Sequence, residues 1–95
     1  MESLVRWHCI AAGRVQGVNY RARVADAACR HGLVGSVENR PDGTVYIDVQ
    51  GPQGKVEAFL RDVSGARGCS YATSVRRVED LPASPSLLGF EILRD

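Results

Sequence analysis

The 95-residue sequence lacks the features that identify membrane-spanning, secreted and non-specific nucleic-acid-binding proteins. No apolar run approaches the roughly 20 residues that a membrane-spanning helix needs, and residues 1–6 lack the basic and apolar regions of a signal peptide. Neither charge predominates, because 12 basic residues stand against 11 acidic ones. The overall basic field of a non-specific nucleic-acid binder is therefore missing. We expect a cytoplasmic globular protein.

Cysteine is scarce and scattered. Cys9, Cys29 and Cys69 form no C-x-x-C pair and have no pair of histidines nearby. A disulfide framework or a zinc site needs closer and more numerous ligands. We therefore interpret the three as small apolar residues in a reducing compartment. The sequence predicts no metal and no cofactor.

The length of the chain suits one hydrophobic core. No internal repeat, linker or low-complexity tract divides the sequence, so we expect a single domain over residues 1–95. No apolar helix face is left over for a partner, which favours a monomer.

Hydrophobic periodicity predicts seven elements. Strands are expected over residues 6–12, 33–40, 44–50, 70–79 and 88–93, and helices over residues 20–31 and 52–63. Residues 44–50 alternate apolar and polar side chains, which predicts one buried face and one face in water. Val75 and Val78 break the alternation of the fourth strand and indicate a bulge. In the last strand, Phe90 and Ile92 are expected to face the core.

The order of these elements is β-α-β-β-α-β with an extra strand near the end. Right-handed crossovers place both helices on one face of an antiparallel sheet. The predicted fold is therefore a ferredoxin-like α+β sandwich. Enzymes, RNA-binding domains and metal chaperones all use this architecture, so the fold alone does not give the function.

The segment between the first strand and the first helix has the chemistry of an anion site. Gly13 and Gly17 allow tight backbone bends, and the loop runs directly into a helix N-terminus, where unpaired N–H groups and the helix dipole attract anions. Arg21 begins the helix with a forked guanidinium that suits a phosphate. The alternative is a plain strand-to-helix connection with a solvated arginine. The segment matches neither a Walker loop nor G-x-G-x-x-G, so nucleotide binding is not indicated.

Asn39 is the second candidate, because asparagine is disfavoured in strands and its carboxamide can donate to and accept from a water molecule. The alternative is that Asn39 and Asp42 serve only as turn residues around Pro41 and Gly43. Periodicity does not decide whether Asn39 meets Arg21.

Two motifs are similar to the signatures of the acylphosphatase family. Residues 13–21, GRVQGVNYR, resemble the first signature, G-x-V-x-G-V-x-aromatic-R, and residues 35–45, GSVENRPDGTV, resemble the second, G-x-V-x-N-x-x-x-G-x-V. The spacing, the chain length and the strand order also fit, so the resemblance covers nearly the whole chain. Ser36 departs from it, since the family usually has a large aromatic residue there.

The resemblance implies metal-independent hydrolysis of acyl phosphates to a carboxylate and inorganic phosphate. It implies that Arg21 and Asn39 are catalytic. It also implies that Arg21 and a run of backbone amides bind the phosphate, the amides being those of Gln16, Gly17, Val18, Asn19 and Tyr20.

Two other functions remain open at this stage. One is a non-catalytic anion-binding or RNA-binding module, although the K/R-G-F/Y-G/A-F pattern of RNA-recognition domains is absent from the sequence. The other is an accessory domain like those within larger maturation proteins. Phosphate release from a simple acyl phosphate distinguishes all three functions.

Overall fold

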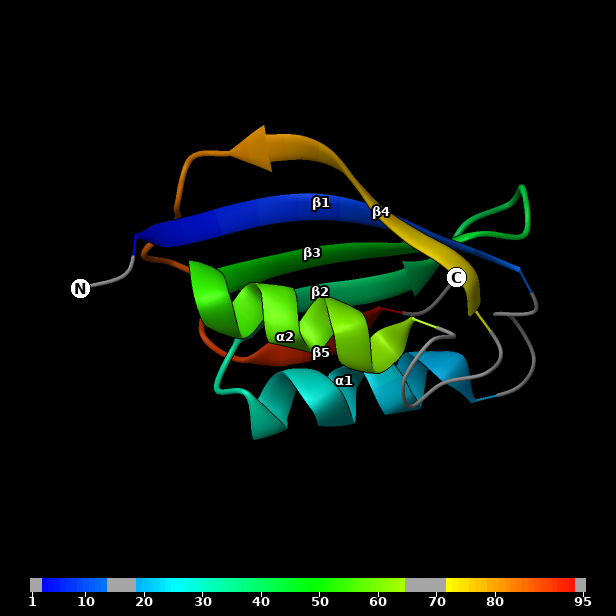
Figure 1. Ribbon diagram of the computed structural model, residues 1–95, viewed down its shortest axis with the longest axis horizontal. Coiled ribbons are helices and arrows are strands. Elements are labelled where there is room, and N and C mark those ends of the chain that lie inside the picture. The colour runs from blue at the N-terminus through cyan, green and yellow to red at the C-terminus, as the bar shows by residue number, and fades with distance from the viewer. Residues whose placement is uncertain (1–2, 14–18, 65–71, 94–95) are drawn as a thin grey trace.

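Two helices cover one face of a five-stranded sheet (Figure 1). The computed structural model describes residues 3–13, 19–64 and 72–93. The elements are β1 (Leu4–Gly13), α1 (Tyr20–Arg30), β2 (Val34–Asn39), β3 (Val45–Pro52), α2 (Gln53–Val63), β4 (Ala72–Leu81) and β5 (Phe90–Leu93). Each element that the periodicity predicts is present, with ends that differ by at most two residues.

The sheet has the order β4-β1-β3-β2-β5. The pairs β1–β3, β1–β4 and β2–β3 are antiparallel, and with the two helices they confirm the ferredoxin-like fold. The expectation of a wholly antiparallel sheet needs one correction, because β5 pairs with β2 in parallel. The chain leaves β4 at one edge of the sheet and crosses to the opposite edge before β5 begins.

Helix α1 follows its predicted pattern. Its buried residues are Tyr20, Val24, Ala27 and Ala28. The helix ends at Arg30, and Gly32 after the cap residue has a φ of +70°, the left-handed conformation that glycine adopts without strain. The N–H of Leu33 then donates to the carbonyl of Ala28 at 2.9 Å, which completes a Schellman cap.

The face of β3 that points away from the helices is less exposed to solvent than the alternation of apolar and polar residues predicts. Asp48 and Gln50 are both buried, although they lie on the face that carries no helix. Arg6 covers Asp48 and donates two hydrogen bonds to its carboxylate, at 3.0 and 2.8 Å. Gln50 exchanges hydrogen bonds with the backbone of Ser84, from the segment that links β4 to β5. Alternation predicts the face on which a side chain lies but not what later covers it.

The edge strands carry the other deviations. Ile92 lies on the core side of the sheet as expected, because it pairs with the fully buried Val37. It is nevertheless 44% exposed, since β5 is an edge strand with one neighbour in the sheet. Phe90 does pack against the core. On β4, the register with β1 shifts between Glu79 and Arg77 and leaves Val78 as the extra residue of a bulge, as predicted.

Gly35 of the second motif has a structural function. Its φ is +141°, and a Cβ at this position would lie 1.8 Å from the backbone oxygen of Asp48 on β3. A side chain cannot fit there, so β2 and β3 pair closely only because residue 35 is glycine.

Candidate functional site

Asn39 is the last residue of β2, at the end of the sheet where β1 also ends. It pairs with Val45 of β3, and Val45 pairs with Ala11 of β1. Directly opposed residues of an antiparallel pair share a face, and Val45 is fully buried beneath the helices. The side chain of Asn39 therefore lies on the helix side of the sheet, the side from which α1 approaches.

Arg21 reaches the same corner from α1. Its Nη1 donates to the backbone carbonyl of Leu93 at 2.7 Å, and Leu93 of β5 pairs with Glu38 of β2. Glu38 directly precedes Asn39. The parallel strand β5 thus holds the guanidinium near the end of β2.

The N-terminus of α1 is built without a competing negative charge. Asn19 is the cap residue, and its φ of 64° and ψ of 22° are left-handed. It makes no side-chain capping hydrogen bond, and the first turn contains no acidic residue. The first-turn N–H groups and the positive end of the helix dipole are therefore not neutralised by a side chain of the helix itself. Gln16, Gly17 and Val18 of the predicted phosphate loop lie outside the described residues.

The carboxamide oxygen of Asn39 is buried and has no hydrogen-bond partner. No other buried side-chain nitrogen or oxygen in the described segments lacks one. An acceptor in this state is rare in proteins and calls for an explanation. It has the capacity to accept a hydrogen bond from a water molecule or a ligand.

The turn after β2 does not use this oxygen. Asp42 accepts hydrogen bonds from the backbone N–H of Thr44 at 3.0 Å and from its hydroxyl at 2.6 Å. These bonds lower the pKa of Asp42 below its usual value. The side-chain hydrogen bonds of this turn are therefore made by Asp42, and the carboxamide oxygen of Asn39 takes no part in them.

The described cysteines differ from each other. Cys9 is fully buried, and desolvation raises the pKa of its thiol to about 12, so it is not a thiolate nucleophile at neutral pH. Cys29 is exposed on α1. The interpretation of Cys9 as a small apolar residue fits its burial. Cys69 lies outside the described residues.

A group of polar side chains on the face without helices was not foreseen. His8 contacts the hydroxyl of Tyr46 and lies 3.6 Å from the carboxylate of Asp48, which Arg6 also binds. These side chains project from β1 and β3 away from α1, because they alternate with the buried core positions. This group is therefore separated from Arg21 and Asn39 by the sheet.

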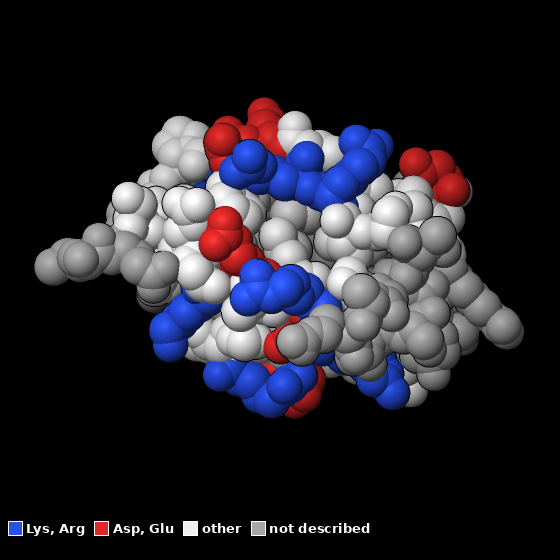
Figure 2. All heavy atoms as spheres, viewed as in Figure 1, with Lys and Arg blue, Asp and Glu red and all other residues white. Residues whose placement is uncertain are grey.

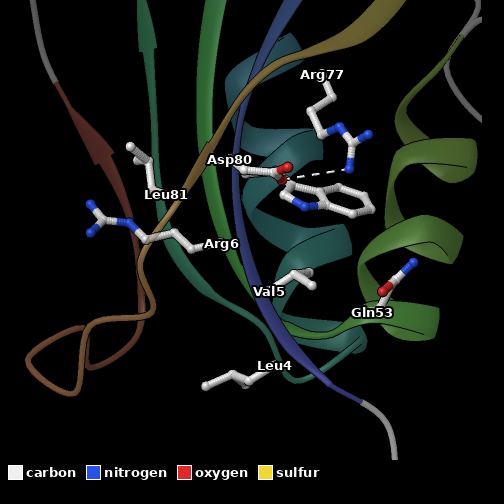
Figure 3. Close-up of a pocket in the computed structure, with 8 residues that line it drawn as sticks. Leu4, Val5, Arg6, Gln53, Arg77, Asp80 and Leu81 are labelled. Carbon is white, nitrogen blue, oxygen red and sulfur yellow. Dashed lines mark ion pairs between the residues drawn. The ribbon is translucent and has the colours of Figure 1, made fainter.

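A pocket of about 260 Å³ also lies away from the site. It is lined by residues from the start of β1, the end of β4 and the start of α2, among them Leu4, Gln53 and Leu81 (Figure 3). Asn39, by contrast, is level with Ala11 near the end of β1. The pocket is therefore at the opposite end of the sheet from the corner that holds Arg21.

The helix-bearing surface does not carry charge of one sign. Figure 2 shows acidic and basic side chains interspersed over the described part of that face. In the described segments, no three His, Cys, Asp or Glu side chains are placed to hold a metal ion, and no helix there is long and apolar enough to span a bilayer.

Known proteins resemble this chain in sequence and in structure. The acylphosphatase family model matches residues 7–92. An acylphosphatase from Cupriavidus pinatubonensis is 52% identical over 86 residues, which are 90% of this chain and 92% of that protein. The crystal structure of acylphosphatase from Bacillus subtilis has a TM-score of 0.83 and 30% identity, with 94% of this chain and 98% of that chain covered. HypF from T. kodakarensis has a TM-score of 0.79 and 25% identity; the match covers 95% of this chain but 12% of that one.

Proposed function

This chain belongs to the acylphosphatase family, and we propose that it hydrolyses acyl phosphates to a carboxylate and inorganic phosphate through Arg21 and Asn39. The assignment of residues is supported by the placement of both side chains at the same end of the sheet. Arg21 is held at the carbonyl of Leu93, next to the end of β2, where Asn39 presents a buried acceptor without a partner.

The phosphoryl group binds at the start of α1. The family signature gives this role to Arg21 and to the backbone amides of Gln16, Gly17, Val18, Asn19 and Tyr20. Of these residues, Asn19, Tyr20 and Arg21 form the start of the helix, where Asn19 makes no side-chain capping hydrogen bond. Donors that are fixed before the substrate arrives stabilise charge on the phosphoryl oxygens without reorganising during the reaction. The guanidinium of Arg21 contributes two parallel N–H groups whose spacing matches two oxygens of a phosphate.

Asn39 places the water. Its carboxamide oxygen accepts a hydrogen bond from the water and fixes it in line with the bond to the leaving carboxylate. The water oxygen attacks phosphorus, the bond between phosphorus and the acyl oxygen breaks, and the carboxylate departs with the electron pair. A carboxamide is no strong base, so a phosphoryl oxygen of the substrate takes the proton of the water. The transition state is loose and the leaving group is good, so no covalent intermediate is required.

The reaction requires no metal and no cofactor in this proposal. The charge that a metal would neutralise is met by Arg21 and the helix amides. We further propose that the chain acts as one domain, as a monomer in the cytoplasm, with a small acyl phosphate as its substrate, inorganic phosphate as its product, and neither a nucleic acid nor a membrane as a partner.

The alternative function is a non-catalytic domain that binds an anion without turning it over. Phosphate release from acetyl phosphate by the purified chain in excess chelator distinguishes the two. Turnover that is competitively inhibited by inorganic phosphate, and that disappears in Arg21→Ala, supports the proposal. Phosphate binding without turnover supports the alternative, and a strict requirement for a divalent metal contradicts the proposed chemistry.

A further inference from the structure

The first residue of α1 carries a buried hydroxyl that connects the two helices. Tyr20 is 1% exposed, and its hydroxyl donates to the backbone carbonyl of Val63 at 2.8 Å. Val63 is the last residue of α2, where a helix leaves its final carbonyls without partners inside the helix. The start of α1 and the end of α2 lie at the same end of the molecule (Figure 1).

Tyr20 occupies a sensitive position in the proposed site. It follows the left-handed cap residue Asn19 and directly precedes Arg21. Its own N–H is one of the amides assigned to the phosphate. Whatever fixes the ring of Tyr20 therefore fixes the direction of the first-turn donors and the base of the arginine side chain. Such donors stabilise a developing charge only when they are held within about 0.5 Å of the productive geometry.

Two separate elements hold this turn. The carbonyl of Leu93 on β5 fixes the tip of the Arg21 side chain, whereas the carbonyl of Val63 on α2 fixes the backbone of the turn through Tyr20. The ring of Tyr20 fills the core beneath the helices, and a phenylalanine ring would fill the same space. The hydroxyl adds a directional contact that packing of the ring does not supply.

We propose that the hydroxyl of Tyr20 and the carbonyl of Val63 form a positioning device that orients the phosphate-binding turn of α1. This inference rests on the proposed function, because it concerns the same site. The C-terminus of α2 thereby supports phosphate binding although it lies outside both sequence motifs.

The variant Tyr20→Phe removes the hydroxyl and keeps the ring. We expect its dissociation constant for inorganic phosphate, measured by calorimetry, to rise three- to tenfold, on the scale of one hydrogen bond. The KM for acetyl phosphate should rise by a similar factor. The matched control is Tyr46→Phe, which removes a part-buried hydroxyl that is hydrogen-bonded to His8 on the face without helices. Both variants should unfold at a lower temperature, but only Tyr20→Phe should lose phosphate affinity.

The outcomes separate this inference from the proposed function. If the unmodified chain binds no phosphate, the proposed function fails. If it binds phosphate and Tyr20→Phe binds it equally well, the positioning role is overturned while the proposed function stands. Equal losses of affinity in both variants indicate a general effect of stability, and a Tyr20→Phe chain that does not fold assigns the hydroxyl to the fold; either result also overturns the positioning role.

Discussion

Replacing Asn39 with alanine should separate turnover from stability. The carboxamide oxygen is buried without a partner, and an unpaired buried polar group costs roughly 1–3 kcal/mol of folding free energy. Removing the group relieves that cost, and this gain offsets the packing that the longer side chain provides. We expect the free energy of unfolding of Asn39→Ala to stay within about 1 kcal/mol of the unmodified value.

Turnover should fall sharply in the same variant. A water that is no longer fixed in line with the leaving group costs about 10²-fold in kcat, which is about 2.7 kcal/mol in the barrier. The inhibition constant for phosphate should change much less, because Arg21 and the amides of α1 remain. Steady-state kinetics with phosphate as inhibitor and thermal unfolding of the same preparation measure these quantities together.

Asn39→Asp is the stricter test of the same role. The carboxylate keeps an acceptor at the same place but adds negative charge beside the bound phosphoryl group, and like charges repel. Phosphate affinity should therefore fall together with kcat, in contrast to Asn39→Ala.

Asp42 provides the control, because it makes the hydrogen bonds of the neighbouring turn. Asp42→Ala should unfold at a lower temperature and keep its kcat per folded molecule. Those bonds lower the pKa of Asp42 in the folded state, so its stabilising effect is present above about pH 3.9, the ordinary pKa of an unfolded aspartate. The effect disappears as the pH falls through the lower folded value. A loss of stability with unchanged kcat in Asn39→Ala would make Asn39 a turn residue and refute the catalytic role.

Three further experiments test Arg21, Gly35 and the cysteines. Arg21→Ala should abolish hydrolysis and weaken inhibition by phosphate, with little change in melting temperature. Arg21→Lys should not restore activity, because an ammonium lacks the two-pronged geometry of a guanidinium. A near-normal kcat in either variant would contradict the role of Arg21. Gly35→Ala places a Cβ against the carbonyl of the neighbouring strand at a φ of +141° and should lower the free energy of unfolding by more than about 2 kcal/mol, as measured by denaturant titration. In a Cys69→Ser background, a thiol reagent should label Cys29 in the folded protein and Cys9 only after unfolding; rapid labelling of both would show that the core is open.

Most of the fold could be predicted from local patterns. The apolar spacing in α1 identified its buried residues because one helix face is buried along its whole length. The same reasoning failed at Asp48, where the partner Arg6 lies 42 residues away in the sequence and no local pattern reports it. At Ile92 it gave the correct face of the sheet but not the exposure of the side chain, because alternation does not tell an edge strand from a central one.

The residue types of the site could be predicted from the sequence, but the backbone groups that hold their side chains in place could not. Asn19 did carry a signal for its left-handed conformation, since asparagine tolerates that region better than most residues. The position of Arg21 depends on the backbone of Leu93, and that of Tyr20 on the backbone of Val63. A backbone carbonyl is present at every residue, so the sequence gives no indication of which one a distant side chain will contact.

In the proposed mechanism, the site holds the phosphoryl group and places a water for attack at phosphorus. The most direct test is turnover of acetyl phosphate in water enriched in oxygen-18, followed by mass spectrometry of both products. Attack at phosphorus places the label in inorganic phosphate and leaves acetate unlabelled. Label in the acetate would show attack at the carbonyl carbon, and would contradict the roles given to Arg21 and Asn39.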